Sequence, residues 1–529
     1  MINRDWSLGV GVALSLLTTG VSAQEMPTGT AQDLIWQETN TESGESFPSA
    51  QLPGSRRETL EVPREEDLPP TGVEIEAIEI RYLDAEGNPT EGKAKPYIYQ
   101  RQFDLEPGDR YDEQKARLGL AGVKRLIIVN DATVVLEPTA EGKVIMAVNV
   151  QEGSDFRFAF ALDLRHPSAL FGAARPPTVL ANSYRPGGIS GGIRFAKLNL
   201  GGNDQIVSLG IEAGEGTLGF DFDFRDPRMG NSKVGYGFNV FNTRRREPVF
   251  NLGDPEVELA NGDDPWVHRI GGGVEFYRPL NQDESFLGTL GLSYQQISVR
   301  DDMFSSELFS EDEFGNTLTL SDDGSDTLLT LSFAAALDKR NRRSYATDGS
   351  RLLFETNQAI PIGDAQIFFN RLSANYTQYI PMPLFGFAEG EKTLVLNVQG
   401  GTLIGDEIPP YEAFNLGGGS SVRGYSTGEI GSGRNFIQGT AEYRFPIAVI
   451  SIAENDIPLG GGLFFDYATD FGTGDEIQGE PAEERDKPGD GFGYGAGLRA
   501  KTPFGAVRLE FALNDEGGSA VIFSIGDRF

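Results

Sequence analysis

Apolar and polar residues alternate in short segments along most of the chain, and polar, glycine-rich or acidic breaks separate these segments. Successive side chains of a β-strand point to opposite faces, so each segment predicts a strand with one apolar and one polar face. Near the end of the chain, Val507, Leu509 and Phe511 share one face, and Arg508 and Glu510 share the other. The pattern therefore predicts a chain that is mainly β.

About sixteen such segments follow one another over residues 154–529. Many have roughly the ~10 residues that a tilted membrane-spanning strand needs, and a charge on a lipid-facing side would cost ~2–4 kcal/mol at the bilayer midplane. We predict that residues 154–529 form a sixteen-stranded antiparallel transmembrane β-barrel that closes at Phe529. A soluble β-sandwich would alternate in the same way and is the alternative.

The breaks between the predicted strands differ in length. Barrels of this kind typically have short periplasmic turns and long external loops. The longest breaks all follow odd-numbered strands, which places them on the outside: 251–266, 301–326, 405–433 and 471–491. Their acidic composition predicts solvated, mutually repelling loops, with weak calcium binding as the alternative. Two connections on the predicted periplasmic side, 339–349 and 381–392, are longer than this rule predicts.

The residues before the barrel begin with two segments that are not expected to fold. Residues 1–23 predict a secretory signal peptide, because Arg4 precedes an apolar stretch and small residues suit cleavage after Ala23. An N-terminal membrane anchor is the alternative, although the stretch is shorter than the ~20 residues of a spanning helix. Residues 24–72 are polar and contain several prolines, which predicts a disordered linker.

Residues 73–153 predict a small α+β domain. Residues 73–83 alternate like a strand, residues 111–126 have a helical period, and two more strands follow. Asp112 stands where the helix begins, so its carboxylate can accept hydrogen bonds from the free backbone N–H groups of the first turn. A further helix around Lys95 to Gln102 is only weakly indicated.

Composition narrows the classes of function. The 529 residues include no cysteine and carry a net charge of −33, which excludes a disulfide-stapled scaffold and argues that nucleic acid is not a partner. A Gly-x-Ser-x-Gly match at residues 188–192 lies inside a predicted strand and not at a strand-to-helix turn. His166 and His268 have no recognisable catalytic neighbours, and a Ser-His lipase is the enzymatic alternative. We expect no catalytic residues, no cofactor and no metal site.

The break after the eleventh predicted strand is rich in glycine, which permits tight and left-handed backbone turns. It contains the motif Val422, Arg423, Gly424 and Tyr425. An arginine buried inside a barrel needs a carboxylate partner because its guanidinium is permanently charged. Of the inward-facing acids that follow, Asp466 is the first choice and Glu442 the second. The alternative is an exposed loop arginine.

The last predicted strand ends in an aromatic residue. Val521, Phe523, Ile525 and Phe529 share one face of it. An outer-membrane strand with such an end resembles the signal by which barrels are recognised for insertion, so we single out Phe523, Ile525 and Phe529. The alternative is a strand end whose side chains only face lipid.

Three segments together resemble one protein family. Val-Arg-Gly-Tyr in the glycine-rich loop is followed by Ala-Glu-Tyr-Arg-Phe-Pro at 441–446 and by Gly-Leu-Phe-Phe-Asp at 462–466. This order resembles the BamA/TamA superfamily of outer-membrane assembly factors and polypeptide transporters, over about Val73 to Phe529. The resemblance implies a sixteen-stranded barrel in which Arg423 reaches inward and pairs with Asp466.

The resemblance also implies POTRA modules in the periplasm. The Leu-x-Pro-Gly-Asp-x-Tyr turn at 105–111 fits such a module, but the chain shows one module where the family usually carries more. The segment 338–352 resembles a family stretch but lacks its proline. These departures concern the role of the protein within the family.

The function that the resemblance implies is non-enzymatic. The protein would assist insertion of β-barrel proteins into the outer membrane or translocation of polypeptides across it, and the sequence leaves these two open. The implied partners are unfolded outer-membrane or secreted polypeptides, outer-membrane lipids and accessory periplasmic proteins. The implied location is the cell outer membrane. The alternative is a passive outer-membrane channel or a surface structural protein with acidic external loops.

Overall fold

The computed structural model describes residues 72–163 and 190–529, except for residues 85, 231, 283, 343–344, 364–365, 453–454, 503–504 and 526. The predicted signal peptide, nearly all of the predicted linker and His166 lie outside the described residues. The chain divides into two compact units. One contains the described residues of Leu34–Phe156 with Lys197–Ile206, and the other contains those of Arg157–Ala196 with Val207–Phe529.

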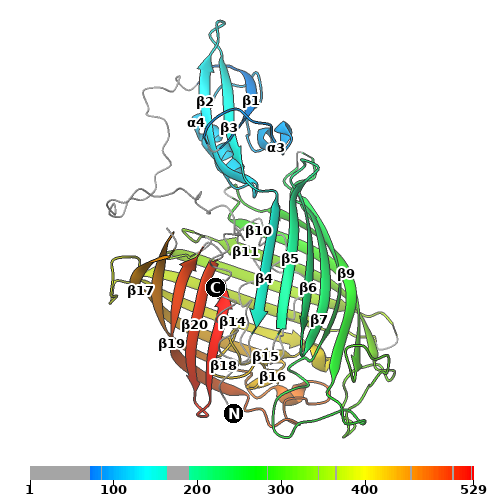
Figure 1. The fold of residues 1–529 in the computed structure, drawn as a ribbon. Helices are drawn as coiled ribbons and strands as arrows, with labels where there is room; N and C mark the ends of the chain where they lie inside the picture. The colour runs from blue at the N-terminus through cyan, green and yellow to red at the C-terminus, as the bar shows by residue number, and fades with distance from the viewer. Residues whose placement is uncertain are drawn as a thin grey trace. The chain divides into compact units, whose positions relative to one another are not determined.

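The first unit contains a three-stranded sheet and two helices, drawn in blue and cyan in Figure 1. Its elements in chain order are β1 (Ile75–Leu83), α3 (Pro96–Gln100), α4 (Glu113–Lys124), β2 (Val129–Pro138) and β3 (Val144–Glu152). The central strand β3 is parallel to β1 and antiparallel to β2. In the part of the chain that the structure describes, no helix is long and apolar enough to cross a membrane.

Helix α4 begins at the predicted cap. The Asp112 carboxylate accepts a hydrogen bond of 3.0 Å from the backbone N–H of Lys115. This bond satisfies one of the N–H groups that the first turn of a helix leaves unpaired. In the turn before it, Gly108 has a φ of +97°, which glycine adopts without a steric penalty. Helix α3 has only five residues, which explains why the sequence indicates it weakly.

The second unit is built on a sixteen-stranded sheet whose strands follow one another in chain order. Neighbouring strands with a described register run antiparallel. The strands are β4 (Phe156–Asp163), β5 (Ser190–Leu200), β6 (Gln205–Gly214), β7 (Thr217–Asp226), β8 (Gly235–Arg245), β9 (Trp266–Pro279), β10 (Phe286–Arg300), β11 (Ser325–Asp338), β12 (Gly349–Ile360), β13 (Asn370–Pro381), β14 (Thr393–Ile404), β17 (Asn435–Ile452), β18 (Asn455–Thr469), β19 (Asp490–Thr502), β20 (Gly505–Asn514) and β21 (Ser519–Ile525).

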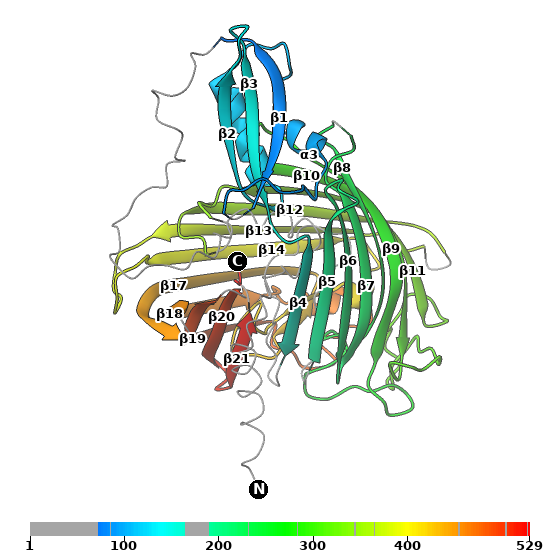
Figure 2. The same cartoon turned by 45° about the horizontal axis from the view of Figure 1, so that its top comes forward.

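This sheet curves round, so that it has a concave inner face and a convex outer face, as Figures 1 and 2 show. Strands β4 and β21 are the two ends of the strand order, and no pairing between them is found among the described residues. The mainly β class is therefore confirmed. Closure of the sheet into a barrel stays a prediction.

The convex face of the sheet is apolar. On β10, Leu290, Leu292 and Tyr294 are 51%, 42% and 54% exposed, whereas Ser293 and Gln295, which alternate with them, are buried. The same alternation leaves apolar side chains exposed on many other strands, among them Phe238, Val240, Val274, Phe276, Leu331, Phe333, Leu396, Val398, Leu463, Phe465, Leu509 and Phe511. Soluble proteins rarely leave so extended an apolar surface open, whereas a lipid-facing sheet requires one.

The concave face carries charged side chains that pair across strands. Arg194 on β5 forms ion pairs with Asp221 (2.5 Å) and Asp223 (3.0 Å) on β7. Arg225 on β7 pairs with Glu275 on β9 (2.5 Å). Buried charges need such partners because leaving water is costly for an isolated ion. The alternation in the sequence therefore separates an apolar outer face from a charged inner face.

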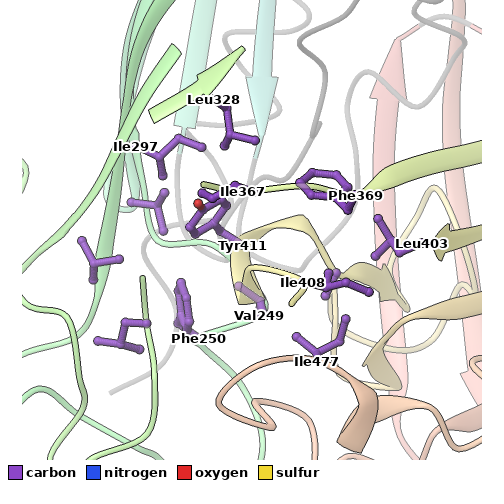
Figure 3. Packing of buried hydrophobic residues seen from close by; sticks show 14 of the residues in the cluster. Val249, Phe250, Ile297, Leu328, Ile367, Phe369, Leu403, Ile408, Tyr411 and Ile477 are labelled. Carbon is purple, nitrogen blue, oxygen red and sulfur yellow. The ribbon is translucent and has the colours of Figure 1, made fainter. Parts of the chain in front are cut away.

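Four long connections lie at one end of the antiparallel sheet, between β8 and β9, β10 and β11, β14 and β17, and β18 and β19. Their apolar side chains form one buried cluster with residues at the neighbouring strand ends, and Figure 3 shows its packing. The cluster members that come from these connections include Val249, Phe250, Leu259, Leu318, Ile408, Tyr411, Ala413 and Ile477. The connections are thus folded against one another.

Most acids of these connections are exposed, as the prediction of solvated acidic loops requires, for example Glu307, Glu313 and Asp322. What the prediction lacks is the buried core beneath them, which also encloses an acid at the start of β11. Asp326 is fully buried and accepts hydrogen bonds from the backbone N–H of Ser321 (2.8 Å) and from the hydroxyl of Tyr411 (2.6 Å). Burial, together with the Asp326 carboxylate beside it, raises the pKa of Tyr411 well above its ordinary value. The apolar residues of the loops are spaced widely among acids, so the sequence pattern does not show that they meet.

The apolar convex face predicts that the cost of adding a charge depends on its depth in the membrane. We expect Leu292→Arg, in the middle of β10, to destabilise the folded protein in lipid vesicles by about 2–4 kcal/mol, because the arginine would face lipid. Denaturant unfolding followed by tryptophan fluorescence measures this cost. The matched control is Gln296→Arg on the same face near the strand end, with an expected cost of about 0–1 kcal/mol. Equal costs at both positions would contradict a lipid-facing convex surface.

Candidate functional site in the glycine-rich loop

The glycine-rich connection between β14 and β17 folds into the space that the concave face encloses, where Figure 1 shows its two short strands. It contains a 3-10 turn, η1 (Pro410–Glu412), and the strands β15 (Phe414–Leu416) and β16 (Gly431–Gly433), which pair antiparallel. Gly417 and Gly424 have φ of +109° and +106°. Other residues rarely adopt this conformation, so glycine makes the reversal of the loop possible.

Arg423 in this loop is fully buried and paired with three carboxylates. Its Nε and Nη2 donate to the two oxygens of Asp466 on β18 (2.7 and 3.0 Å). Its Nη1 donates to Glu442 on β17 (3.0 Å) and to Glu510 on β20 (2.8 Å). The backbone N–H of Arg423 also donates to Asp466 (3.2 Å). A planar guanidinium suits this two-pronged pairing, which a lysine ammonium cannot reproduce.

Aromatic and glycine residues shape the space around Arg423. Its guanidinium carbon lies 3.4 Å from the ring centroid of Phe464 on β18, a cation–π contact. On β19, a Cβ atom placed on Gly493 would lie 1.8 Å from the carbonyl oxygen of Arg423. A Cβ on Gly491 would lie 2.9 Å from the hydroxyl of Tyr425. Side chains at these two positions would therefore prevent the loop from approaching β19.

Asp466 also holds the end of the chain. Nη1 of Arg528 donates to both of its oxygens (3.2 Å each), and Nη2 of Arg528 donates to the carbonyl of Ser421 in the loop (2.5 Å). Asp466 further accepts from the hydroxyl of Thr440 (2.8 Å). One carboxylate thus links the loop, two strands and the residues that follow β21.

A second group of charges extends this network. Glu442 accepts from Nε of Arg444 (2.8 Å) and from Nη1 of Arg499 (2.9 Å). Both arginines also pair with Asp527, at 2.8 and 3.1 Å. The acids that face Arg423 are therefore shared with other buried arginines, and Arg508 adds a contact to Glu510 (3.5 Å). Each carboxylate partner of Arg423 is thus also held by another arginine, so the network can hold the loop firmly.

The far side of the motif is tied to the hairpin between β20 and β21. The hydroxyl of Tyr425 donates to Asp515 (2.7 Å), and Nδ2 of Asn514 donates to the carbonyl of Gly424 (3.1 Å). Val422 is fully buried in a small apolar cluster with Tyr425. All four residues of the motif therefore have contacts with the body of the sheet or with the loop itself.

The prediction that Phe529 shares the outward face of the last strand is wrong. Strand β21 ends at Ile525, and Val521 on it is 45% exposed, whereas Phe529 is only 7% exposed. Phe529 packs with Tyr379 and Val395, and the Tyr379 hydroxyl donates to its main-chain oxygen (2.8 Å). The pairing of Asp527 and Arg528 with charges of the concave face draws the terminal residues inward.

The structure brings Arg423, Asp466 and Glu442 together. It adds Glu510 and Arg528, which the sequence analysis did not single out as partners. The sequence holds one signal for the missed part. On β19, glycine occupies every second position from Gly491 to Gly497, which marks a strand face without side chains. In the described part of the chain, no group of three or more His, Cys, Asp or Glu side chains is placed to hold a metal ion.

Comparison with known proteins fits this geometry. Residues 199–529 match the family model of the Omp85 superfamily domain, which is more than half of the chain. The chain belongs to the Omp85 superfamily. The resemblance to the BamA/TamA group that the motifs indicated is thereby confirmed.

Relatives of this Omp85 protein occur in chloroplasts. It is 29% identical to Outer envelope protein 80, chloroplastic, of Arabidopsis thaliana and 28% identical to Protein TOC75, chloroplastic, of Pisum sativum. Each match covers 86% of this chain but only 57% and 56% of the relative, so the chain spans less than two thirds of their lengths. A crystal structure of BamA from Haemophilus ducreyi lacking POTRA domains 1–3 is similar in fold, with a TM-score of 0.55, 15% identity and coverage of 84% and 83%.

Loss of the arginine should release the loop. We expect Arg423→Ala to destabilise the inward position of the loop by about 3–5 kcal/mol, because buried carboxylates lose their shared partner. Arg423→Lys should fall between alanine and wild type, because it keeps the charge without the planar fork. Since the chain has no cysteine, the labelling rate of Ser420→Cys with a membrane-impermeant maleimide reports loop exposure.

The matched control for this variant is Arg434→Ala in the same connection. Arg434 pairs with Glu476 (3.2 Å) and donates to the carbonyls of Leu403 and Gly405 (2.7 and 3.0 Å), so its contacts lie outside the charge cluster of Arg423. Its labelling rate should stay close to wild type. Unchanged labelling in Arg423→Ala would show that the charge cluster does not hold the loop.

Gly493→Ala tests the close approach of the loop to β19. The added methyl group would collide with the Arg423 carbonyl, so we expect faster labelling at Ser420→Cys and a loss of stability of about 1–3 kcal/mol. Gly462→Ala on β18 is the control, because a Cβ there meets nothing within 4 Å. Equal behaviour of the two alanine variants would argue against this packing.

Proposed function

We propose that this Omp85 protein assists the insertion of β-barrel proteins into the outer membrane, or the passage of polypeptides across it, without enzymatic chemistry. The observation that carries the proposal is the inward loop, in which the buried Arg423 is held by Asp466, Glu442 and Glu510. Membership of the superfamily supports it, as do relatives named as outer envelope proteins. The expected partners are unfolded polypeptides, outer-membrane lipids and accessory periplasmic proteins.

The proposed site of action in the membrane is a seam between the two end strands. We infer that β4 and β21 meet when the sheet closes into a transmembrane barrel over residues 154–529. Among the described residues these two strands are the ends of the strand order, so each has one edge without a neighbour. An open strand edge pairs readily with another strand. A seam of this kind would support insertion over secretion.

The first unit is proposed to be a single POTRA domain, residues 73–153, in the periplasm. Its two edge strands are β1 and β2. The edge of β1 is partly occupied by bridges from Glu74 to Arg110 and from Leu83 to Pro89. Among the described residues, β2 has no partner on its outer side, so its backbone can pair with an extended client segment. Such pairing captures unfolded chains with little sequence selection.

A passive channel is less well supported. A channel requires a continuous polar passage, whereas here a loop occupies the interior and the four long connections share a buried apolar cluster. A simple pore also has no use for an N-terminal α+β domain. The aromatic end of the chain remains a proposed recognition signal at Phe523, Ile525 and Phe529. Since Phe529 is buried in the folded protein, such a signal would be read before folding is complete.

Depletion of the protein in its source organism, followed by quantitative proteomics of the outer membrane, tests the function. We expect the levels of other barrel proteins or of secreted polypeptides to fall. Wild-type protein should restore them, and Arg423→Ala should restore them only in part because its loop is released.

The control for complementation is Phe314→Ser, which changes a 64% exposed side chain in the connection between β10 and β11. It should complement fully. Unchanged levels of every other barrel protein and secreted polypeptide after depletion would refute polypeptide handling and favour a passive or structural role.

A further inference from the structure

The connection between β13 and β14 is long for a turn on the predicted periplasmic side. It spans residues 382–392 and lies at the end of the sheet opposite the four long connections, where short turns are expected. Residues 381–388 read Pro-Met-Pro-Leu-Phe-Gly-Phe-Ala and contain no charge, in a chain with a net charge of −33. We propose that this turn inserts its apolar tip into the boundary of the lipid bilayer beside the barrel.

The tip of the turn is highly exposed. Leu384, Phe385 and Phe387 are 67%, 43% and 75% exposed. In the neighbouring hairpin of β17 and β18, which belongs to the same end of the sheet, Val449 and Ile450 are 61% and 43% exposed. Large apolar side chains that gather on a surface in this way mark a site of contact with a lipid or a protein.

The turn lies over the convex face of β17. Tyr443 and Phe445 occupy alternate positions on that face but are only 7% and 9% exposed, whereas Ile437 on the same face is 40% exposed. The ring of Phe385 packs against both, with centroid separations of 5.0 Å from Tyr443 and 4.8 Å from Phe445, and the ring centroid of Phe387 lies 5.8 Å from that of Phe445. The exposed tip is therefore continuous with the face that the proposed barrel presents to lipid.

The backbone of the turn is suited to an apolar surrounding. The N–H groups of Leu384 and Phe385 donate to the hydroxyl of Tyr443 (3.1 and 3.0 Å), which in turn donates to the carbonyl of Phe385 (2.8 Å). The N–H of Phe387 donates to the carbonyl of Pro446 (2.9 Å). Irregular backbone can enter a membrane only where its polar groups find partners within the protein. The tip meets this requirement for these three N–H groups.

The chemistry of the turn selects lipid as the occupant. Aromatic side chains with aliphatic neighbours prefer the interface of a bilayer, where their rings reach acyl chains and headgroups. The charges that follow, Glu389, Glu391 and Lys392, stand at the base of the turn, and Glu391 is paired with Arg342. Polar residues at the base and apolar residues at the tip give the turn the polarity of a membrane boundary.

This inference rests on the proposed membrane-spanning barrel, and one experiment separates the two. Single-cysteine variants of the full chain are labelled with an environment-sensitive fluorophore and reconstituted in phosphatidylcholine vesicles. The test positions are Leu384→Cys and Phe387→Cys, which are exposed enough to tolerate the change. Leu396→Cys on the convex face of β14 reports the barrel, and Phe314→Cys reports a loop in water. Nitroxide-bearing lipid and aqueous iodide serve as quenchers.

We expect nitroxide lipid to reduce the fluorescence at Leu384 and Phe387 about as strongly as at Leu396, with a blue-shifted emission, while iodide quenches only the label at Phe314. Iodide quenching at both turn positions, with Leu396 quenched by lipid, would overturn this inference and leave the barrel intact. Shielding of both turn positions from both quenchers would also overturn it, in favour of protein contact. Iodide quenching at Leu396 would refute the membrane-spanning barrel itself.

Discussion

The arrangement of the interior depends on one guanidinium group facing three carboxylates. Arg423 comes from a loop, whereas Asp466, Glu442 and Glu510 come from β18, β17 and β20. Without the arginine, three acids would remain close together on a poorly hydrated face, and each would lack part of its compensation. The inward position of the loop and the three acids on the inner face of the strands therefore depend on each other.

Other features of the interior follow from this contact. The loop can reach Asp466 only because β19 presents glycine at Gly491 and Gly493. The Asp466 carboxylate is shared with Arg528, so the position of the loop is coupled to the residues that follow the last strand. Arg528 follows β21, an end strand of the sheet, so the loop and the residues after this end strand share one carboxylate.

The parts of the fold that could be predicted from sequence are those with a local signal. Alternation with a period of two identifies strands because neighbouring residues alone decide which side chains face outward, as on β10 and β20. Asp112 could be predicted as a helix cap because its hydrogen bond reaches only three residues along the chain, to Lys115. Asp466 and Glu442 could be selected because alternation places them on the inner face. Family resemblance then connected them with Arg423.

The parts that could not be predicted depend on residues far apart in the chain. Glu510 and Arg528 join the site through the curvature of the sheet, which alternation does not encode. Alternation continued beyond Ile525 places Phe529 on the outer face, whereas ion pairs of Asp527 and Arg528 turn the terminal residues inward. The core of the long connections has no local signal, because its members, such as Phe250 and Ile477, lie far apart in the sequence among acids.

Single-channel recording of the reconstituted full chain tests most directly whether the Arg423 loop occupies the interior. The account predicts a small conductance for the wild type and a larger one after deletion of residues 417–433. A wild-type conductance already as large as that of the deletion variant would contradict the central claim that the ion-paired loop fills the interior of the sheet.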